Sequence, residues 1–430
     1  MGQTVGVSEE TGGAGAARQL SVGSASVAVG LGVFGLATFV YLGVVGRDLG
    51  PADYAPVSLA FTLVNALGLG LFFPVEQETA RLMAFRRAHG APAPSLRHVL
   101  RYLGIAWLAI AVVALVARGP IARSFLAGEP SMVPVTAAAL GALGVEYLVR
   151  GTLSGSGRFL RYGAQLAVDG GARAGLALLV MATGRGSVLA FGLVLVVAPL
   201  LAAAVTVSMA AIRWLREAPT ATGPTPIAAL VGTTVTSQLV ANAGPLAISA
   251  LAGPVERAGA GSFVSAITVA RIPLFLFAAV QAAFLPTLSG LVARRAVDEF
   301  RQTLRVALWA TLGVGVAGVV GVALVGEWFL HLIYGPLFTV ALLDLDLVAL
   351  SGAVFMLAQA CAQAVLSHRR DTLGLVGWAA GLLATVASLW LPLPLTTRVA
   401  TALVVGATVS TVVHGTVLII TVRAWAEGHR

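Results

Sequence analysis

The chain is a succession of long apolar stretches separated by short polar ones. Each stretch is close to the length of about 20 residues that a helix needs to cross a bilayer. Alternating polar and apolar positions and long polar loops are missing, which excludes an outer-membrane barrel. The pattern predicts an all-α integral membrane protein with about 12 transmembrane helices, at residues 22–45, 55–75, 99–117, 132–149, 162–183, 187–212, 226–252, 259–285, 304–326, 338–366, 372–391 and 397–422.

Composition and charge agree with this prediction. The 430 residues are 58% hydrophobic and 10% charged, whereas about a quarter of the residues of a soluble domain are charged. The net charge of +9 comes from Arg alone, in short clusters between the apolar stretches. We interpret these clusters as topology signals, not as a nucleic-acid-binding surface. Most of them fall on the side of the two termini, which predicts a multi-pass protein of the cytoplasmic membrane with both termini in the cytoplasm.

The two halves of the chain share a pattern. Phe73-Pro74 closes the second apolar stretch and Leu285-Pro286 closes the eighth, and an Arg pair follows each of them. We therefore expect two six-helix lobes related by a pseudo-two-fold axis along the membrane normal. Their predicted ranges are 21–212 and 227–430, with a disordered cytoplasmic tail at 1–20 and a cytoplasmic linker at 213–226.

Arg271 is the leading candidate for function because it interrupts the eighth apolar stretch. A charge at the centre of a bilayer costs about 2.5 kcal/mol or more, so it is expected to face a wet cavity or a partner. Pro273 lacks the N–H of a helical residue and predicts a kink beside the charge, and we expect Pro286 to end the helix. The guanidinium suits a phosphate or diphosphate. The alternative is a structural Arg that binds the carbonyls freed by Pro273.

Further candidates lie in other stretches. Asp169 and Arg173 are four residues apart and can pair on one helix face. The alternative is a switch, in which a substrate phosphate takes Arg173 and frees Asp169 to bind a proton. Asn242 is expected to line the cavity, because Gly244-Pro245 should break the helix beside it.

Other acidic residues have more ordinary interpretations. Asp344 and Asp346 lie some two turns into the tenth stretch on opposite sides of the helix, so at most one can face the cavity, as a site for proton or sodium coupling. Glu146–Arg150 has the spacing of a salt bridge, and Glu76 and Glu78 are expected to pair with Arg81, with a role in a gate as the alternative. The six His and the single Cys361 have no metal-ligand spacing, and no catalytic or cofactor motif appears. We expect no metal, no cofactor and no enzymatic activity.

Several segments carry a resemblance to a known family. GRDLGPADYAPVSLAFTLVNALG, RGTLSGSGRFLRYG, ARIPLFLFAAVQAAFLPTLSGLVARRAVDEFRQTLR and GEWFLHLIYGPLF resemble the polysaccharide-biosynthesis flippases of the multidrug/oligosaccharidyl-lipid/polysaccharide (MOP) exporter superfamily. The resemblance covers nearly the whole chain. It departs in the seventh stretch, where members often carry Asn followed by Asp and this chain has Asn242 and then Gly244.

The resemblance implies a monomeric transporter that flips a lipid-linked sugar phosphate by alternating access, beside membrane lipids and glycan-assembly enzymes. Arg271, Arg173 and Asn242 are then the candidate substrate-binding residues, and Asp169, Asp344 and Asp346 the candidates for ion coupling. Three alternatives stay open: a cation-coupled multidrug exporter of the same superfamily, a membrane glycosyltransferase or polymerase, and an inactive scaffold. Short external loops disfavour the glycosyltransferase, and an exporter would favour unpaired cavity carboxylates.

Overall fold

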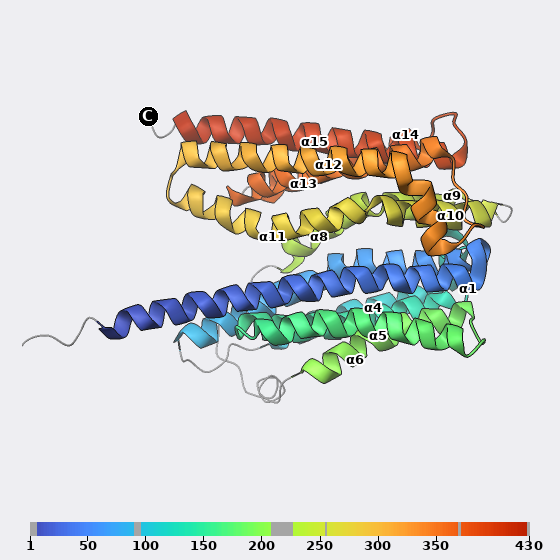
Figure 1. Ribbon diagram of the computed structural model, residues 1–430, viewed down its shortest axis with the longest axis horizontal. Helices are drawn as coiled ribbons and strands as arrows, with labels where there is room; N and C mark the ends of the chain where they lie inside the picture. Colours follow the sequence, from blue (N-terminus) through green and yellow to red (C-terminus); the bar gives the residue numbers. More distant parts are fainter. Residues whose placement is uncertain (1–6, 90–95, 208–226, 254–255, 369–370, 428–430) are drawn as a thin grey trace, which may run out of the picture.

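The computed structural model describes residues 7–89, 96–207, 227–253, 256–368 and 371–427. This part of the chain is helical with short connections, and it contains no strand. The helices, labelled as in Figure 1, are α1 (Val7–His89), α2 (Arg97–Val116), α3 (Arg118–Phe125), α4 (Met132–Gly155), α5 (Phe159–Ala182), α6 (Val188–Thr206), α8 (Ile227–Ala241), α9 (Ala243–Leu251), α10 (Arg257–Ala270), α11 (Ile272–Ala293), α12 (Val297–Tyr334), α13 (Leu342–Ser367), α14 (Asp371–Ser388) and α15 (Leu395–Glu427).

The long helix α1 is two spans joined at a sharp turn. Gly50 has φ 73° and ψ 173°, a backbone conformation that glycine adopts without steric cost, and Pro51 starts the second span. At its other end α1 begins at Val7, so residues 7–20, which the sequence predicts as a disordered tail, are helical. Extending an existing helix fixes only one residue per added hydrogen bond, and the Ala residues of this segment favour it.

The described residues supply twelve segments that could cross a bilayer. Eight helices are long and apolar enough to cross a bilayer by length and composition alone, and α1 is long enough to do so twice. The shorter helix α14 and two broken spans, α8 with α9 and α10 with α11, supply the others. The described chain therefore has the all-α, twelve-helix architecture that the hydrophobic pattern predicts.

Two prolines do not end their helices, contrary to the prediction. Pro74 lies inside α1, which continues to His89, and Pro286 lies inside α11, which continues to Ala293. A proline removes one helical hydrogen bond, and membrane helices tolerate this because neighbouring groups satisfy the freed carbonyl. Both helices instead end close to Arg pairs, Arg86–Arg87 and Arg294–Arg295.

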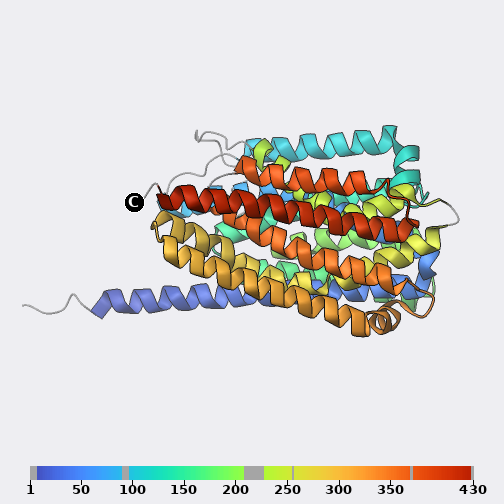
Figure 2. The same cartoon turned by 90° about the horizontal axis from the view of Figure 1, so that it is seen from above.

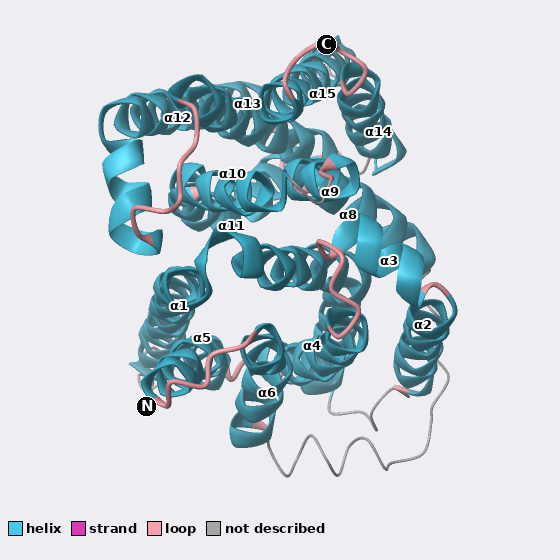
Figure 3. Cartoon of the chain, turned by 90° about the vertical axis from the view of Figure 1, so that its right-hand side faces the viewer, coloured by secondary structure: helices cyan, strands magenta, loops and turns pink. Residues whose placement is uncertain are grey.

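The helices form two lobes. Helices α4, α5 and α6 pack against one another and around α1, while α12 to α15 pack together with α11. Seen from above, most of them run along the long axis of the molecule, and the start of α1 and the end of α15 lie at the same end (Figure 2). Viewed along that axis, α8, α10 and α11 lie on the side of the second lobe that faces α1 (Figure 3). The predicted linker at 213–226 lies outside the described residues.

The lobes touch at the end of the molecule that holds the Gly50 turn. Arg47 Nε donates to the carbonyl of Ile333 in the last turn of α12 at 2.8 Å. The ring of Tyr54 contacts the rings of Tyr334 and Phe338 with centroids 5.4 and 5.3 Å apart. We call these five residues the end clasp. Because Arg47 and Tyr54 belong to the first lobe and the others to the second, the clasp joins the lobes on the side opposite the termini.

Candidate functional site

A cavity of about 330 Å³ lies between the two lobes. Its first-lobe wall consists of residues of α1, α4 and α5, and its second-lobe wall consists of residues around the helix breaks α8–α9 and α10–α11. The charged and amide side chains that line it are Asn65, Arg150, Asp169, Arg173, Gln238, Asn242 and Arg271. The three candidate binding residues and one coupling candidate from the sequence therefore meet at one cavity.

Arg271 occupies the break between α10 and α11. It ends α10 and begins α11, with φ −87° and ψ 0°, so the kink that Pro273 predicts is present. Its Nη1 donates to Asn242 Oδ1 at 3.2 Å, and its Nη2 donates to the carbonyl of Ala241. Both acceptors are neutral, and within the described part of the chain no carboxylate pairs with Arg271.

The Ala241 carbonyl is free to accept from Arg271 because of a second proline, Pro245. In a regular helix the N–H of residue 245 would bond to the carbonyl of Ala241, but Pro245 has no N–H to donate. The helix accordingly breaks at Asn242, between α8 and α9, and the freed Ala241 carbonyl accepts from Arg271. Asn242 Nδ2 in turn donates to the carbonyl of Gln238 at 3.0 Å. Two broken spans thus hold one guanidinium at the cavity.

Asp169 and Arg173 form the predicted pair on α5. Arg173 Nη2 lies 3.0 Å from both carboxylate oxygens of Asp169, and the two residues are 2% exposed or less. The guanidinium also lies over the rings of Phe34 and Phe61, at 5.3 and 5.8 Å, where the negative face of each ring favours a cation. Arg173 Nε has no hydrogen-bond partner. This guanidinium is therefore neutralised by Asp169 but keeps a free donor at Nε.

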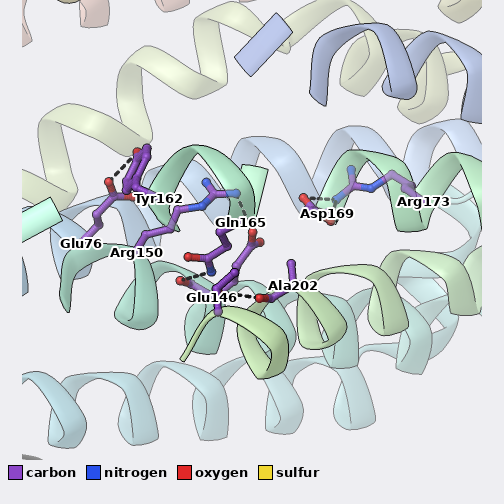
Figure 4. A network of polar contacts seen from close by, with 9 residues as sticks. Glu76, Glu146, Arg150, Tyr162, Gln165, Asp169, Arg173 and Ala202 are labelled. Carbon is purple, nitrogen blue, oxygen red and sulfur yellow. Dashed lines mark hydrogen bonds and ion pairs between the residues drawn. The ribbon is translucent and has the colours of Figure 1, made fainter. Parts of the chain in front are cut away.

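Arg150 is a cavity residue that the sequence interpretation missed. Its Nη2 donates to Glu146 Oε1 at 2.6 Å, as the spacing predicts, but it also lines the cavity. Gln165 donates to the backbone carbonyl of Glu146 at 3.3 Å. Figure 4 shows these groups in a row with the Asp169–Arg173 pair. The sequence feature that could have indicated its place in the cavity is the row of polar residues at helical spacing on α4 and α5.

The row of polar side chains on α4 and α5 extends to Tyr162 and to Glu76 of α1. Tyr162 donates its hydroxyl to Glu76 Oε1 at 2.9 Å. Glu78 pairs with Arg81, at 2.7 Å, as predicted, but Glu76 does not pair with Arg81, contrary to the prediction. Glu76 and Glu78 are both buried, but neither lines the cavity. The contact of Glu76 with Tyr162 joins α1 to α5, and Glu78 lies 3.3 Å from His98 of α2.

Asp344 and Asp346 do not line this cavity. The sequence places them two turns into a helix, but α13 begins only at Leu342, so Asp344 lies in its first turn. The reason is the loop of residues 335–341, which turns at Gly335 with φ 97°. Asp344 is 2% exposed, and its Oδ1 has no hydrogen-bond partner. Its position in the first turn of α13 is one where the helix dipole stabilises a carboxylate. Neither residue is brought to the Arg271 site.

Among the described residues, no group of three or more His, Cys, Asp or Glu is arranged to hold a metal ion. The charged groups at the cavity are mostly guanidiniums, which can donate hydrogen bonds to an anion. Three guanidiniums face one cavity, and two of them already have a carboxylate partner.

Solved structures share this architecture. An inward-facing multidrug resistance MATE family transporter of the MOP superfamily superposes with a TM-score of 0.74 and 16% identity, covering 93% of this chain and 98% of that one. An outward-facing MATE transporter gives 0.65 with 19% identity, covering 94% and 95%. The chain has the fold of MOP-superfamily transporters. A third such structure, from Pyrococcus furiosus, gives 0.67 with 18% identity over 94% and 95%, and is described as having a binding pocket of reverse polarity that suggests a different function.

The sequence relatives are uncharacterized proteins, so they do not indicate a function. An uncharacterized protein of Mycobacterium tuberculosis strain H37Rv is 29% identical over 418 residues, which is 92% of this chain and 90% of that protein. An uncharacterized protein of Mycobacterium bovis is 27% identical over 416 residues, 91% and 90% of the two chains. No family profile matches the sequence. The comparisons establish a multi-pass membrane fold and do not assign a substrate.

Proposed function

We propose that the protein transports a lipid-linked sugar phosphate across the cell membrane by alternating access. The observation that carries this proposal is Arg271, a guanidinium in the cavity between the lobes whose hydrogen-bond acceptors are all neutral. A headgroup phosphate crossing the membrane loses its hydration and needs a counter-charge with several donors. A guanidinium provides both.

The charges around the cavity support an anionic ligand. Arg150 and Arg173 are neutralised by Glu146 and Asp169, so Arg271 leaves the site with a net positive charge within the described residues. The cavity volume of about 330 Å³ lies in the range of small-molecule sites. A diphosphate headgroup is of that size, while the lipid chain would remain in the bilayer.

The conformation fits a state open toward the cytoplasm. The superposition is better on the inward-facing transporter than on the outward-facing one, with TM-scores of 0.74 and 0.65. The end clasp joins the lobes opposite the termini, and the Arg distribution predicts that the termini are cytoplasmic. In this proposal the clasp is the closed external side, and it must separate to release the ligand.

A multidrug exporter is the second candidate, because the similar MATE structures are described as multidrug transporters. A cationic drug would need a free carboxylate in the cavity. Asp169 is the carboxylate among the described cavity residues, and both of its oxygens are within 3.0 Å of Arg173. The cavity of this chain therefore favours the lipid-linked phosphate.

Ligand binding to the purified protein distinguishes the two functions. We would measure binding of a long-chain prenyl diphosphate and of a lipophilic cationic dye to the wild type in nanodiscs, with the neutral prenyl alcohol as control for the lipid chain. Saturable binding of the diphosphate, without binding of the alcohol or the dye, supports the proposal. Binding of the dye alone would instead indicate the exporter.

A further inference from the structure

A buried histidine lies in the second lobe, away from the inter-lobe cavity. His414 is on α15 and is 0% exposed. Its Nδ1 lies 2.8 Å from the carbonyl oxygen of Ser410, one turn earlier, and its Nε2 lies 3.0 Å from the carbonyl oxygen of Gly374 on α14. The Ser410 hydroxyl is farther from Nδ1, at 3.4 Å. Both ring nitrogens therefore face main-chain carbonyls at hydrogen-bonding distance.

This geometry matters because carbonyl oxygens only accept hydrogen bonds. A neutral imidazole has one N–H donor and one nitrogen lone pair, so it can donate to one of the two carbonyls and must point its lone pair at the other. The imidazolium has two N–H donors and satisfies both carbonyls. The hydroxyl of Ser410 could serve the lone pair of the neutral ring only at its longer distance.

The groups around the imidazole leave room for the ring and include hydrogen-bond acceptors for its charged form. The ring of Trp378 contacts the imidazole, with centroids 4.8 Å apart and the planes inclined at 59°. Gly377 makes room for the ring, because a Cβ at that position would overlap it. Burial opposes the charged form, whereas the two carbonyls favour it.

We propose that His414 is a proton-binding site, at which one proton is taken up and released while the protein works. In the protonated form Nε2–H donates to the carbonyl of Gly374 on α14, and Nδ1–H donates to the carbonyl of Ser410 on the ring's own helix. Loss of the Nε2 proton turns the contact between the two helices into a repulsion between a lone pair and a carbonyl, so α14 and α15 pack less tightly there. The ligand of the site is the proton itself.

The charge of the ring is not set by a neighbouring acid. Among the described side chains, the titratable and charged groups on His414's own helix and on the helices packed against it are Arg398, Arg423 and Glu427 of α15, Asp344, Asp346 and Cys361 of α13, and Arg271 at the end of α10. None of them forms a hydrogen bond or ion pair with His414 in this part of the chain, and the side chain of Asp371 on α14 lies outside it. The two carbonyls, the Ser410 hydroxyl and the ring of Trp378 are the polar and aromatic groups in contact with the imidazole.

Nitrogen NMR of the protein labelled with ¹⁵N-histidine tests the proposal directly, because Nδ1 and Nε2 resonances distinguish an imidazolium from either neutral tautomer. His414→Gln assigns the signal by its disappearance, and His331→Gln, on α12, is the matched control. We expect both His414 nitrogens to be protonated at low pH and one of them to lose its proton between pH 5 and 9. A ring that stays neutral, or stays charged, over that whole range overturns the proposal.

A second measurement does not require a folded His414 variant. Amide hydrogen exchange of the wild type, corrected for the intrinsic pH dependence, should show protection of residues 374–381 and 406–414 falling as the ring is deprotonated. Protection in α5, which has no contact with His414, should not follow that titration. Equal changes in both regions, or none in either, would contradict the proton-dependent packing of α14 against α15.

Discussion

Arg47 of the first lobe donates from its Nε to the carbonyl oxygen of Ile333 in the second, 2.8 Å away. A second nitrogen of the same guanidinium donates to the carbonyl of Leu332. These carbonyls belong to the last turn of α12, where no further helical N–H is available and the helix dipole is negative. One side chain thus caps a helix of the opposite lobe.

Removing this cap should favour separation of the lobes at the clasp. We expect Arg47→Ala to shift the population toward the outward-facing state by about 1.5–3 kcal/mol, the usual contribution of hydrogen bonds to a charged group. Spin labels at Ala52→Cys and Gly259→Cys, in a Cys361→Ala background, would report the distance across the clasp. Arg185→Ala is the control, because this exposed Arg makes no hydrogen bond or ion pair with the described residues. An unchanged distance distribution in Arg47→Ala would show that the clasp does not hold the lobes.

Neutralising Asp169 should strengthen anion binding. Asp169→Asn leaves the Arg173 guanidinium beside Phe34 and Phe61 without its counter-charge, so the cavity gains one positive charge. We expect tighter binding of a prenyl diphosphate in isothermal titration calorimetry, together with a lower unfolding temperature, because breaking a buried ion pair costs about 3–5 kcal/mol. Glu146→Gln is the parallel change at Arg150. Weaker diphosphate binding in a folded Asp169→Asn protein would be inconsistent with an anion site.

The orientation of the protein can be tested on its short loops. In the Cys361→Ala background, a Cys at Ser156, between α4 and α5, should react with an impermeant thiol reagent only after the cells are opened. A Cys at Arg185, between α5 and α6, should react in intact cells. The Arg distribution sets this expectation, and the reverse labelling pattern would invert the topology.

The breaks in the spans could be predicted from the sequence because a proline acts locally. Pro273 and Pro245 remove particular N–H groups, and the structure breaks at Arg271 and Asn242. The i, i+4 pair Asp169–Arg173 was predictable for the same reason, since both residues lie on one helix.

Contacts between helices could not be predicted in this way. The bond from Arg271 to the Ala241 carbonyl depends on how two broken spans pack. The place of Arg150 in the cavity depends on the packing of α4 against α5. Asp344 was misplaced because the start of α13 is set by the turn at Gly335. The prolines at positions 74 and 286 were misread as helix ends, because a single residue does not show what satisfies its freed carbonyl.

The central claim is that Arg271 binds the phosphate of the transported ligand. Arg271→Lys keeps the charge but loses the planar fork of donors, whereas Arg271→Ala loses both. Arg301→Ala removes an Arg of α12 that lies outside the cavity, paired with Asp298 at 3.8 Å, and controls for a change in net charge. Abundance and unfolding temperature of each variant would be measured alongside transport.

The most direct measurement is movement of a fluorescent prenyl diphosphate across the bilayer of proteoliposomes. We predict that Arg271→Ala lowers the initial rate at subsaturating ligand roughly 10- to 100-fold, since a hydrogen bond to a charged group is worth about 1.5–3 kcal/mol. Arg271→Lys should give an intermediate rate, and Arg301→Ala the wild-type rate. A wild-type rate in a folded Arg271→Ala protein would contradict the account, because the guanidinium would then serve only to bind the Ala241 carbonyl.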